Sequence, residues 1–444
     1  METLGVIGLL AAIGLMIYII FKGMHVIPAC LLCSVLIIFT SDLPLWKTLT
    51  DGYAVAMKNF VGTFLIMFFL GAVFGEMMGK SGAARTISYK IVDIFGVKRS
   101  ILAIILASAI LSYGGVSVFI IVFSMYPITL YVFKEADVNK NLLPAAILLG
   151  AGTFTMTSVP GTPALTNIIP TQFAFLKTTA TAAPIVGMGS AITIFITGYL
   201  YLLWADRRYR ARGEHFVPGE KDVVADLTPE ERAALPPVLT SIIPIIAILV
   251  FIFVANLQKV NSLYAVCLAL TCGIALSCLL FWKQLKGKIF TALNTGGAGS
   301  IMAILNTAAV VGVGGVVSSS PAFKSFINFA MSMSDHFSPL VSAAMAVNVV
   351  AGITGSSSGG LTIFMNTMGQ SYMDMGLNPE VFHRICTIAA GVLDSLPHAG
   401  PNITFMVITG LVYRKAYPHM FAITCLCAGC GLIMALVLAS IGLV

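Results

Sequence analysis

The stretch Gly391-Val-Leu-Asp394-Ser-Leu-Pro397-His398-Ala-Gly-Pro401-Asn-Ile-Thr404 interrupts a long apolar segment near the end of the chain. A similar interruption in the first half reads Gly150-Ala-Gly-Thr-Phe-Thr-Met-Thr-Ser158-Val-Pro160-Gly-Thr-Pro163-Ala-Leu-Thr-Asn167. The prolines, glycines and hydroxyl residues of these stretches cannot continue a helix in hydrocarbon unless protein or water satisfies the freed backbone groups. Paired breaks in two halves of a chain point to the binding site of a secondary transporter. The two breaks therefore predict a membrane transporter.

The composition supports a membrane location. Hydrophobic residues make up 58% of the 444 residues and charged residues only 10%, whereas soluble domains carry about 25% charged residues. Charge-free windows such as 4–21, 182–204 and 420–444 are long enough to cross a hydrocarbon core about 30 Å thick. The net charge of +7 does not indicate nucleic-acid binding, because the basic residues lie at the ends of apolar spans, where they set orientation.

One hydrophilic stretch divides the chain into halves of similar length. Residues 206–236 hold the cluster Arg207-Arg208-Tyr-Arg210-Ala-Arg212 and are expected in the cytoplasm, because basic loops stay on that side. The predicted domains are an N-terminal repeat 1–205 (scaffold 1–78, transport part 100–205), the linker 206–236 and a C-terminal repeat 237–444 (scaffold 237–316, transport part 337–444).

The order of apolar segments recurs in the two halves and predicts an all-α polytopic membrane protein built of two inverted repeats. Each half is expected to hold about five transmembrane helices, a re-entrant hairpin (100–133 and 337–374) and a broken helix (142–172 and 384–413). The odd number of crossings per half inverts the repeats and places both termini outside. On this topology all Lys and Arg residues face the cytoplasm except Lys47, Lys58, Lys177, Lys259, Lys324 and Arg384. A plain bundle of straight helices remains the alternative.

Four helix ends are expected to meet at the membrane centre, two from the hairpin tips and two from the breaks. Helix N-termini present free N–H groups and about half a positive charge, so they can hold an anion although no Lys or Arg is expected at mid-membrane depth in the spans. The doublets Gly114-Gly115 and Gly359-Gly360 align as the two tips. The candidate substrate-binding residues are Ser112, Gly114, Gly115, Ser117, Thr155, Thr157, Ser158, Thr162, Thr166, Asn167, Ser356, Ser357, Ser358, Gly359, Gly360, Thr362, Ser395, Asn402 and Thr404. About half of the hydroxyls are expected only to bond back to their own helix.

Asp394 and His398 are the ionisable residues of the second break. An ionisable side chain inside the membrane is costly and marks function by default, so either residue is a candidate carrier of the coupling proton. Two alternatives stay open: Asp394 could only accept N–H groups, and unwound carbonyls with Ser, Thr and Asn oxygens could cage Na⁺. The nine cysteines lie in apolar spans and are interpreted as small hydrophobic residues. No cofactor or bound metal is expected.

The residues of both breaks carry a resemblance to a known family. Leu393-Asp-Ser-Leu-Pro-His398, followed by Ala-Gly-Pro, and the stretch from Gly152 to Pro163 resemble the gluconate permease family of the ion transporter superfamily. The resemblance implies inverted repeats with scaffold and transport parts, a homodimer and elevator-type movement. It also implies proton symport of gluconate-like sugar acids or short hydroxy-monocarboxylates such as 3-hydroxybutyrate, with Asp394, His398 and the hydroxyls of the tips and breaks as site residues.

The expected function is proton-coupled symport of a small organic anion across the bacterial cytoplasmic (inner) membrane. A sodium-coupled organic anion symporter, or a Na⁺/H⁺-type antiporter of related architecture, is the alternative, although an antiporter generally needs more membrane carboxylates than this chain offers. An enzyme is not expected, because Asp394 and His398 alone are a thin set for hydrolysis. The sequence does not distinguish gluconate from lactate or 3-hydroxybutyrate.

Overall fold

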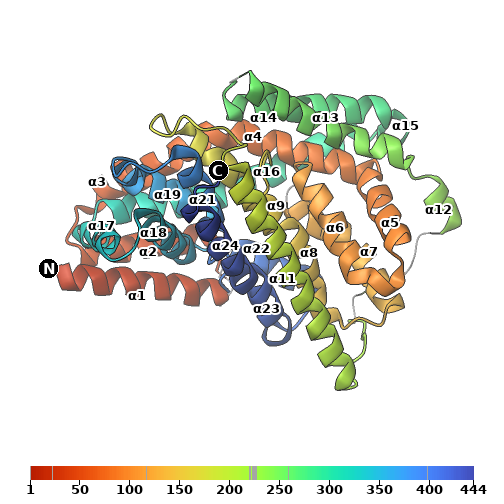
Figure 1. Cartoon of the computed structure of the whole chain (residues 1–444), viewed down its shortest axis with the longest axis horizontal. Helices are drawn as coiled ribbons and strands as arrows, with labels where there is room; N and C mark the ends of the chain where they lie inside the picture. The colour runs from red at the N-terminus through yellow and green to blue at the C-terminus, as the bar shows by residue number, and fades with distance from the viewer. Residues whose placement is uncertain are drawn as a thin grey trace.

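The computed structural model of the chain is helical (Figure 1), and it describes residues 2–22, 24–116, 118–219, 222, 228–258, 260–397 and 399–444. These residues form no strand. Within them, six helices are long and apolar enough to cross a membrane: Leu45–Lys80, Pro184–Ala211, Val238–Ala255, Ser262–Leu280, Ile289–Ser318 and Tyr413–Ser440. The prediction of an all-α chain with several membrane-crossing helices is confirmed.

The first half runs from two apolar helices through a hairpin to a broken helix. Gly82 (φ 81°) and Gly96 (φ 72°) flank its amphipathic helix α5, where the backbone leaves the helical region. The elements are α1 (Glu2–Phe21), α2 (Val26–Thr40), the continuous α3 (Leu45–Lys47), η1 (Thr48–Ala54) and α4 (Val55–Lys80), then α5 (Ala83–Phe95), α6 (Ser100–Tyr113), α7 (Val118–Glu135), α8 (Leu143–Ala151), α9 (Phe154–Thr157), α10 (Leu165–Ile168) and α11 (Pro184–Ala211).

The second half repeats this order after the linker helix α12 (Pro229–Ala233), which Thr228 and Glu231 cap at its N-terminus. Asn261, Ser338 and Asn378 begin three of its helices with side-chain caps. The elements are α13 (Val238–Leu257), α14 (Ser262–Leu280), α15 (Trp282–Leu285), α16 (Ile289–Ser318), α17 (Pro321–Ser332), α18 (Pro339–Thr354), α19 (Ser357–Phe364), α20 (Gln370–Met373), α21 (Pro379–Ala390), α22 (Gly400–Thr409), α23 (Tyr413–Phe421) and α24 (Ala428–Ser440).

Contacts between the halves occur in reciprocal pairs. Helix α2 packs on α16 while α14 packs on α4, and α1 packs on α17 while α13 packs on α5. Figure 1 shows α1 near α17 on the left and α13 with α14 across the upper right. The hairpins follow the same rule, because α7 contacts α22 while α19 contacts α10. Reciprocal contacts are what a two-fold relation between halves produces; the inversion of the repeats across the membrane stays a prediction.

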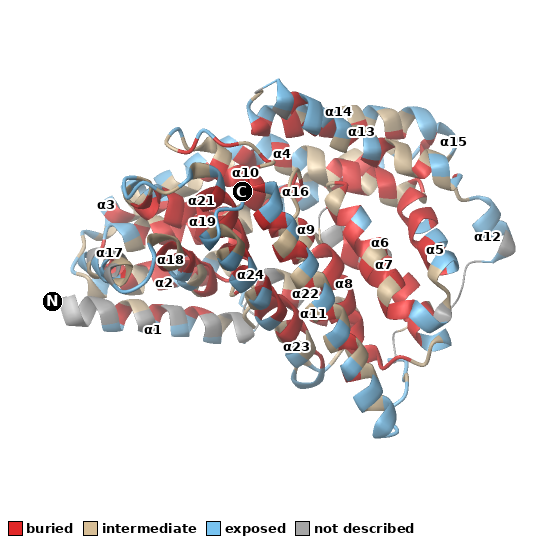
Figure 2. Ribbon diagram, in the orientation of Figure 1, coloured by how far each residue is buried: buried red, intermediate tan, exposed pale blue. Residues whose placement is uncertain are grey.

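Helix α11 shows how the surface divides between lipid and core. Ile192, Ile196 and Leu200 are exposed along one face, while Ile194 and Leu202 are buried on the other. Figure 2 shows the same division on the outer helices, with exposed residues facing outward. Exposed apolar faces of this length are rare on soluble proteins and suit hydrocarbon contact.

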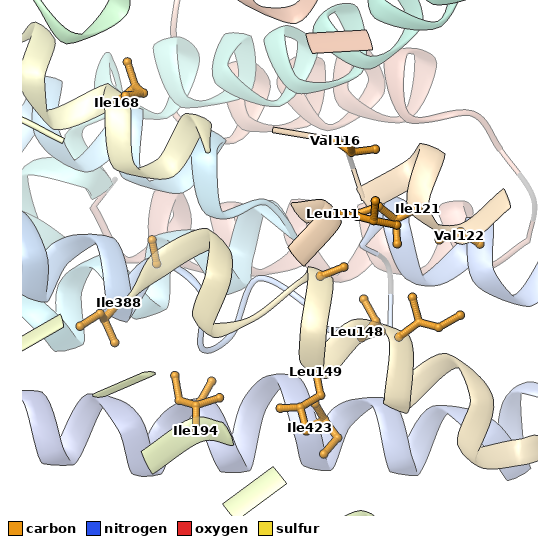
Figure 3. Close-up of a cluster of buried hydrophobic side chains, with 14 of the residues drawn as sticks. Leu111, Val116, Ile121, Val122, Leu148, Leu149, Ile168, Ile194, Ile388 and Ile423 are labelled. Atoms are coloured by element: carbon orange, nitrogen blue, oxygen red, sulfur yellow. The ribbon is translucent and has the colours of Figure 1, made fainter. Parts of the chain in front are cut away.

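The broken helices are held in a shared apolar core. Leu149 of α8, Ile194 of α11 and Ile388 of α21 are buried there together with Ile423, and Figure 3 shows the cluster. The cluster takes side chains from both halves of the chain. It therefore gives the polar residues of the breaks a closely packed surrounding.

The structure corrects two predicted boundaries of the broken spans. Helix α21 begins at Pro379, so Arg384, expected outside the membrane at the start of span 384–413, lies within the helix and is 0% exposed. Arg384 is therefore a buried residue of α21 and not a residue of an exposed loop. The broken helix expected over 142–172 divides into three short helices, α8, α9 and α10, of which the last two contain four residues each.

Candidate functional site

The first hairpin tip lies against the first break. Gly115 turns the chain between α6 and α7 with a φ of 91°, and a Cβ added there would lie 3.3 Å from the ring of Pro163. The Ser112 hydroxyl donates to the Ala151 carbonyl at 2.9 Å, and Thr155 Oγ1 lies 3.2 Å from Ser112 Oγ. The last turn of α6 is therefore joined to the break by hydroxyl groups.

The second hairpin turns at Gly355, whose φ is 59°. The next residue, Ser356, caps α19, because its hydroxyl accepts from the Gly359 amide at 3.2 Å. A Cβ at Gly360 would lie 2.4 Å from the Ala351 Cα, so this glycine allows the two legs to pack closely. The expected alignment of Gly359-Gly360 with the first tip is wrong, since both glycines lie in the first turns of α19.

Asp394 joins the second break to the second tip. The Ser395 hydroxyl donates to Asp394 Oδ1 at 2.8 Å, and the hydroxyl of Ser357, the first residue of α19, also hydrogen-bonds to this carboxyl group. In the part of the chain that the structure describes, Asp394 makes no ion pair. A carboxyl group held by two neutral hydroxyls can gain or lose a proton without breaking a salt bridge.

Protein donors already occupy the carbonyl groups of the second break. The Ser395 carbonyl accepts from Asn402 Nδ2 at 2.7 Å and from the Tyr417 hydroxyl at 3.2 Å. The Pro397 carbonyl accepts from the Tyr413 hydroxyl at 2.5 Å. Asn402 Oδ1 is buried and has no donor among the described residues. A cation in this break would therefore compete with protein donors for the Ser395 and Pro397 carbonyls.

Arg384 of the second half holds the first break. Its Nε donates to the Ala182 carbonyl at 2.9 Å, its Nη1 to Asn167 Oδ1 at 2.9 Å and to the Thr157 carbonyl at 3.4 Å, and its Nη2 to the Ala180 carbonyl at 3.2 Å. No carboxylate pairs with Arg384 in the described residues. The guanidinium therefore places a positive charge beside the hydroxyls of the break, opposed at longer range by the Glu380 carboxylate one turn earlier in α21.

The two breaks touch each other at Thr157. A Cβ added to Gly391 would lie 2.5 Å from Thr157 Cγ2, so only a glycine fits there. Thr157 Oγ1 lies 3.3 Å from Ser158 Oγ, which lies 3.2 Å from Ser190 Oγ of α11. A short chain of hydroxyls therefore runs from the contact between the breaks into α11.

The predicted site residues divide into three groups. The side chains of the first group bond to backbone carbonyls and hold the local fold. Thr166 donates to the Met156 carbonyl at 2.7 Å, Asn167 Nδ2 to the Thr162 carbonyl at 2.9 Å, and Thr362 to the Ser358 carbonyl at 2.7 Å. Gathered around the tips and breaks are Ser112, Gly114, Gly115, Thr155, Thr157, Ser158, Thr162, Ser356, Ser357, Ser358, Gly359, Gly360, Asp394, Ser395 and Asn402. Ser117 and His398 lie outside the described residues, as does the side chain of Thr404.

Arg384 is the main residue that the sequence reasoning missed. A signal for it exists in Asn378-Pro379-Glu380, because Asn378 accepts from the Glu380 amide at 2.9 Å and Pro379 occupies the first turn. A helix that starts there carries Arg384 into its second turn, within the apolar span.

A buried ion pair joins the linker to the segment that follows α7 and to the end of α22. Lys140 Nζ lies 2.7 Å from Asp222 Oδ2 and donates to the Thr409 carbonyl, the last residue of α22, at 2.9 Å. The Tyr126 hydroxyl of α7 donates to Asp222 Oδ1 at 2.5 Å, and the Gly219 amide donates to Oδ2 at 2.6 Å. Burial alone would raise the pKa of Asp222, but the bonds from Lys140, Tyr126 and Gly219 together lower it below its ordinary value.

We expect Asp222→Asn to reduce the free energy of unfolding by about 3–5 kcal/mol, because it leaves Lys140 buried without a counter-charge. Thermal unfolding of the purified protein in detergent measures the loss, and adding Lys140→Met should recover most of it. The matched control is Asp93→Asn, whose pair with Arg232 at 3.5 Å is exposed and should contribute less than about 1 kcal/mol.

The pH dependence of the wild type supplies an independent check. Because the pKa of Asp222 is lowered in the folded state, its stabilising contribution is complete above the ordinary carboxyl pKa of about 4 and is lost as the pH falls below it. Unfolding profiles of the wild type and Asp222→Asn should therefore converge in acid. Equal stability of the two proteins at neutral pH would contradict the role of this pair.

Apolar helices, two hairpin tips and two broken helices that meet around hydroxyls and a carboxylate define a membrane transport protein. The family model of citrate transporters, CitMHS, matches residues 16–294, and the chain belongs to this family. Transport and a multi-pass membrane location are thereby confirmed, and the chain is a transport protein and not an enzyme. The narrower resemblance to gluconate permeases is not confirmed.

Individual relatives agree with this class. The uncharacterized transporter YxjC of Bacillus subtilis (strain 168) is 34% identical, with 94% of this chain and 95% of the relative covered. An uncharacterized transporter of Haemophilus influenzae is 23% identical over 76% of this chain and 75% of its own length. The crystal structure of the YdaH transporter of Alcanivorax borkumensis is similar with a TM-score of 0.53 and 14% identity, covering 90% of this chain and 88% of that one. The last likeness concerns the fold alone.

Proposed function

We propose that the chain is a proton-coupled symporter of a small organic anion in a bacterial cytoplasmic membrane. The observation that carries the proposal is Asp394, a carboxyl group at the junction of the second break and the second tip. It is held by the hydroxyls of Ser357 and Ser395 and has no ion-pair partner in the described chain. Protonation of such a group removes the cost of keeping a charge inside the membrane, so its proton can travel with the substrate.

Two features support a proton over a sodium ion as the coupling ion. The carbonyls of Ser395 and Pro397 already accept hydrogen bonds, so a sodium ion in this break would have to displace protein donors. In the first break the Thr157 and Ala180 carbonyls accept from the Arg384 guanidinium, which repels a second cation. Sodium-coupled anion symport is the alternative, and the liposome experiment below distinguishes it from proton-coupled symport.

The substrate class follows from the donors near the breaks. Helix α22 begins at Gly400 without a side-chain cap in the described residues, and because Pro401 has no N–H, the amides of Gly400 and Asn402 are the first that would donate to an anion. Arg384 adds one positive charge beside Thr157, and the neighbouring hydroxyls suit a hydroxylated acid. We propose a gluconate-like sugar acid or a short hydroxy-monocarboxylate such as 3-hydroxybutyrate, since a single buried cation balances one carboxylate. The family's description adds citrate, a hydroxylated tricarboxylate, as a competitor to test.

The same proposal includes an arrangement in the membrane. The parts 1–78 and 237–316 form the scaffold, and 100–205 and 337–444 form a transport body that moves as an elevator within a homodimer. The reciprocal packing of α2 on α16 and α14 on α4 supports inverted repeats. The basic linker 206–236 then faces the cytoplasm and both termini lie outside.

Uptake into liposomes tests the function. Purified protein is reconstituted and offered labelled gluconate, 3-hydroxybutyrate, lactate and citrate, with an inward proton gradient, in the presence and absence of sodium. We expect a hydroxy-monocarboxylate to accumulate without sodium, and protein-free liposomes give the background. A strict sodium requirement would overturn proton coupling, and accumulation of citrate alone would overturn the monocarboxylate class. Failure of every acid to accumulate would overturn organic anion symport.

A further inference from the structure

A basic cavity lies at one end of the scaffold, away from the tips and breaks. It has a volume of about 860 Å³ and is bounded by the end of α4, the start of α5, the linker helix α12, helix α15 and the residues between α15 and α16. Five basic residues and two acidic residues line it: Lys80, Arg85, Lys283, Lys286, Lys288, Glu76 and Glu231. The residues of this basic cavity have no part in the proposed transport mechanism.

Most of the positive charge in the basic cavity is not neutralised. Lys80 pairs with Glu76 at 3.2 Å. Lys283, Lys286 and Lys288 are exposed and, within the described residues, make no ion pair. Clustered charges of one sign in a concave surface concentrate the field and attract the opposite charge. The cavity is therefore suited to an anion with several oxygen atoms.

The surroundings place the basic cavity at the membrane surface. Trp282, directly before Lys283, is 55% exposed, and Phe290, shortly after Lys288, is 81% exposed. Exposed aromatic side chains gather where the headgroups of a bilayer meet water. Leu279 at the end of α14 is 75% exposed and continues the apolar outer surface beside the cavity. The cavity thus adjoins both headgroups and acyl chains.

We propose that the basic cavity binds the headgroup of an anionic phospholipid. Its phosphate oxygens accept hydrogen bonds from Arg85, Lys283, Lys286 and Lys288, while an acyl chain lies along the exposed apolar surface at Leu279. Basic pockets between transmembrane helices are known to hold such headgroups. A lipid bound there contacts the ends of α4 and α16 and the start of α5 at once, so it stabilises the scaffold where α5 leaves it.

Lipid addition to delipidated protein tests the proposal. The full chain in neutral detergent is titrated with phosphatidylglycerol, cardiolipin, phosphatidylcholine or inorganic phosphate, while thermal unfolding and the mass of the intact complex are measured. We expect the two anionic lipids to raise the unfolding temperature and to remain bound. Replacing the three lysines together, Lys283→Gln, Lys286→Gln and Lys288→Gln, should weaken binding by roughly tenfold or more, since each basic residue near an anionic lipid surface contributes separately.

The matched control removes the same charge elsewhere. Arg207, Arg414 and Lys415 are exposed and do not line the basic cavity, so the triple variant with Gln at these positions should bind the anionic lipids as the wild type does. Equal weakening in both triple variants would overturn the proposal in favour of general charge attraction. A response to inorganic phosphate equal to that to the lipids would overturn the lipid as the occupant. The unfolding temperature without lipid shows that each variant is folded.

Discussion

Asp394→Asn is expected to abolish accumulation of the substrate against its gradient while the protein remains folded in the membrane. The amide has nearly the same shape and still accepts a hydrogen bond from Ser395, but it cannot carry a proton through the cycle. Proton-driven uptake into liposomes measures the loss. Exchange of labelled for unlabelled substrate, which needs no net proton movement, should persist.

Further measurements show whether a loss of uptake in Asp394→Asn comes from the loss of the proton carrier. Ser395→Ala removes one of the two hydroxyls on the carboxyl group and keeps the titratable group itself, so it should slow uptake by less than about tenfold. Normal accumulation by Asp394→Asn under a proton gradient would show that the proton is carried elsewhere. Loss of both accumulation and exchange with an unchanged unfolding temperature would assign Asp394 to substrate binding instead.

Arg384→Met is expected to reduce the stability of the folded protein strongly. The substitution leaves the carbonyls of Ala182, Thr157 and Ala180 without the donor they share, so we expect a loss of about 3 kcal/mol or more. Arg384→Lys should recover only part of it, because one ammonium cannot reach acceptors that a planar guanidinium bridges. Thermal unfolding and substrate uptake are measured on the same preparations.

The control for Arg384 is Arg414→Gln, which changes an exposed arginine on α23 and should alter stability by less than about 0.5 kcal/mol. If Arg384→Met unfolds at the wild-type temperature, its bonds to the first break contribute nothing to stability. If Arg384→Met is stable but does not transport, the positive charge of Arg384 is needed for transport and its hydrogen bonds are not needed for folding.

Much of the helical framework could be predicted from the sequence, because long charge-free segments report membrane spans directly. The charge-free window 4–21 matches α1 (Glu2–Phe21) closely, and the window 182–204 begins close to the start of α11 (Pro184–Ala211). The start of α21 was placed too late in the sequence. The first turns of this helix carry Glu380, His383 and Arg384, which oppose membrane insertion, so the predicted span began only at Arg384. The bonds that compensate this arginine come from the first half of the chain, and no local pattern reports them.

The residues of the candidate site could largely be predicted from the sequence, but the position of the second turn and the contacts between the side chains could not. The residues Thr354-Gly-Ser-Ser-Ser-Gly-Gly360 indicate a turn, but three glycines compete for it. The turn lies at Gly355 because Gly360 is needed where α19 passes close to Ala351. The bond from Ser357 to Asp394 joins two distant segments, so only the folded structure reveals it.

Because Arg384 lies in the second half of the chain and bonds to the first break, the order of synthesis affects how the first break folds. A ribosome makes the first break long before it makes Arg384, so residues 150–183 are inserted without the guanidinium that donates to the carbonyls of Thr157, Ala180 and Ala182. Water or other protein groups must satisfy these carbonyls in the meantime. The first half therefore cannot mature alone, and its break takes its final shape only when the last quarter of the chain has been inserted beside it.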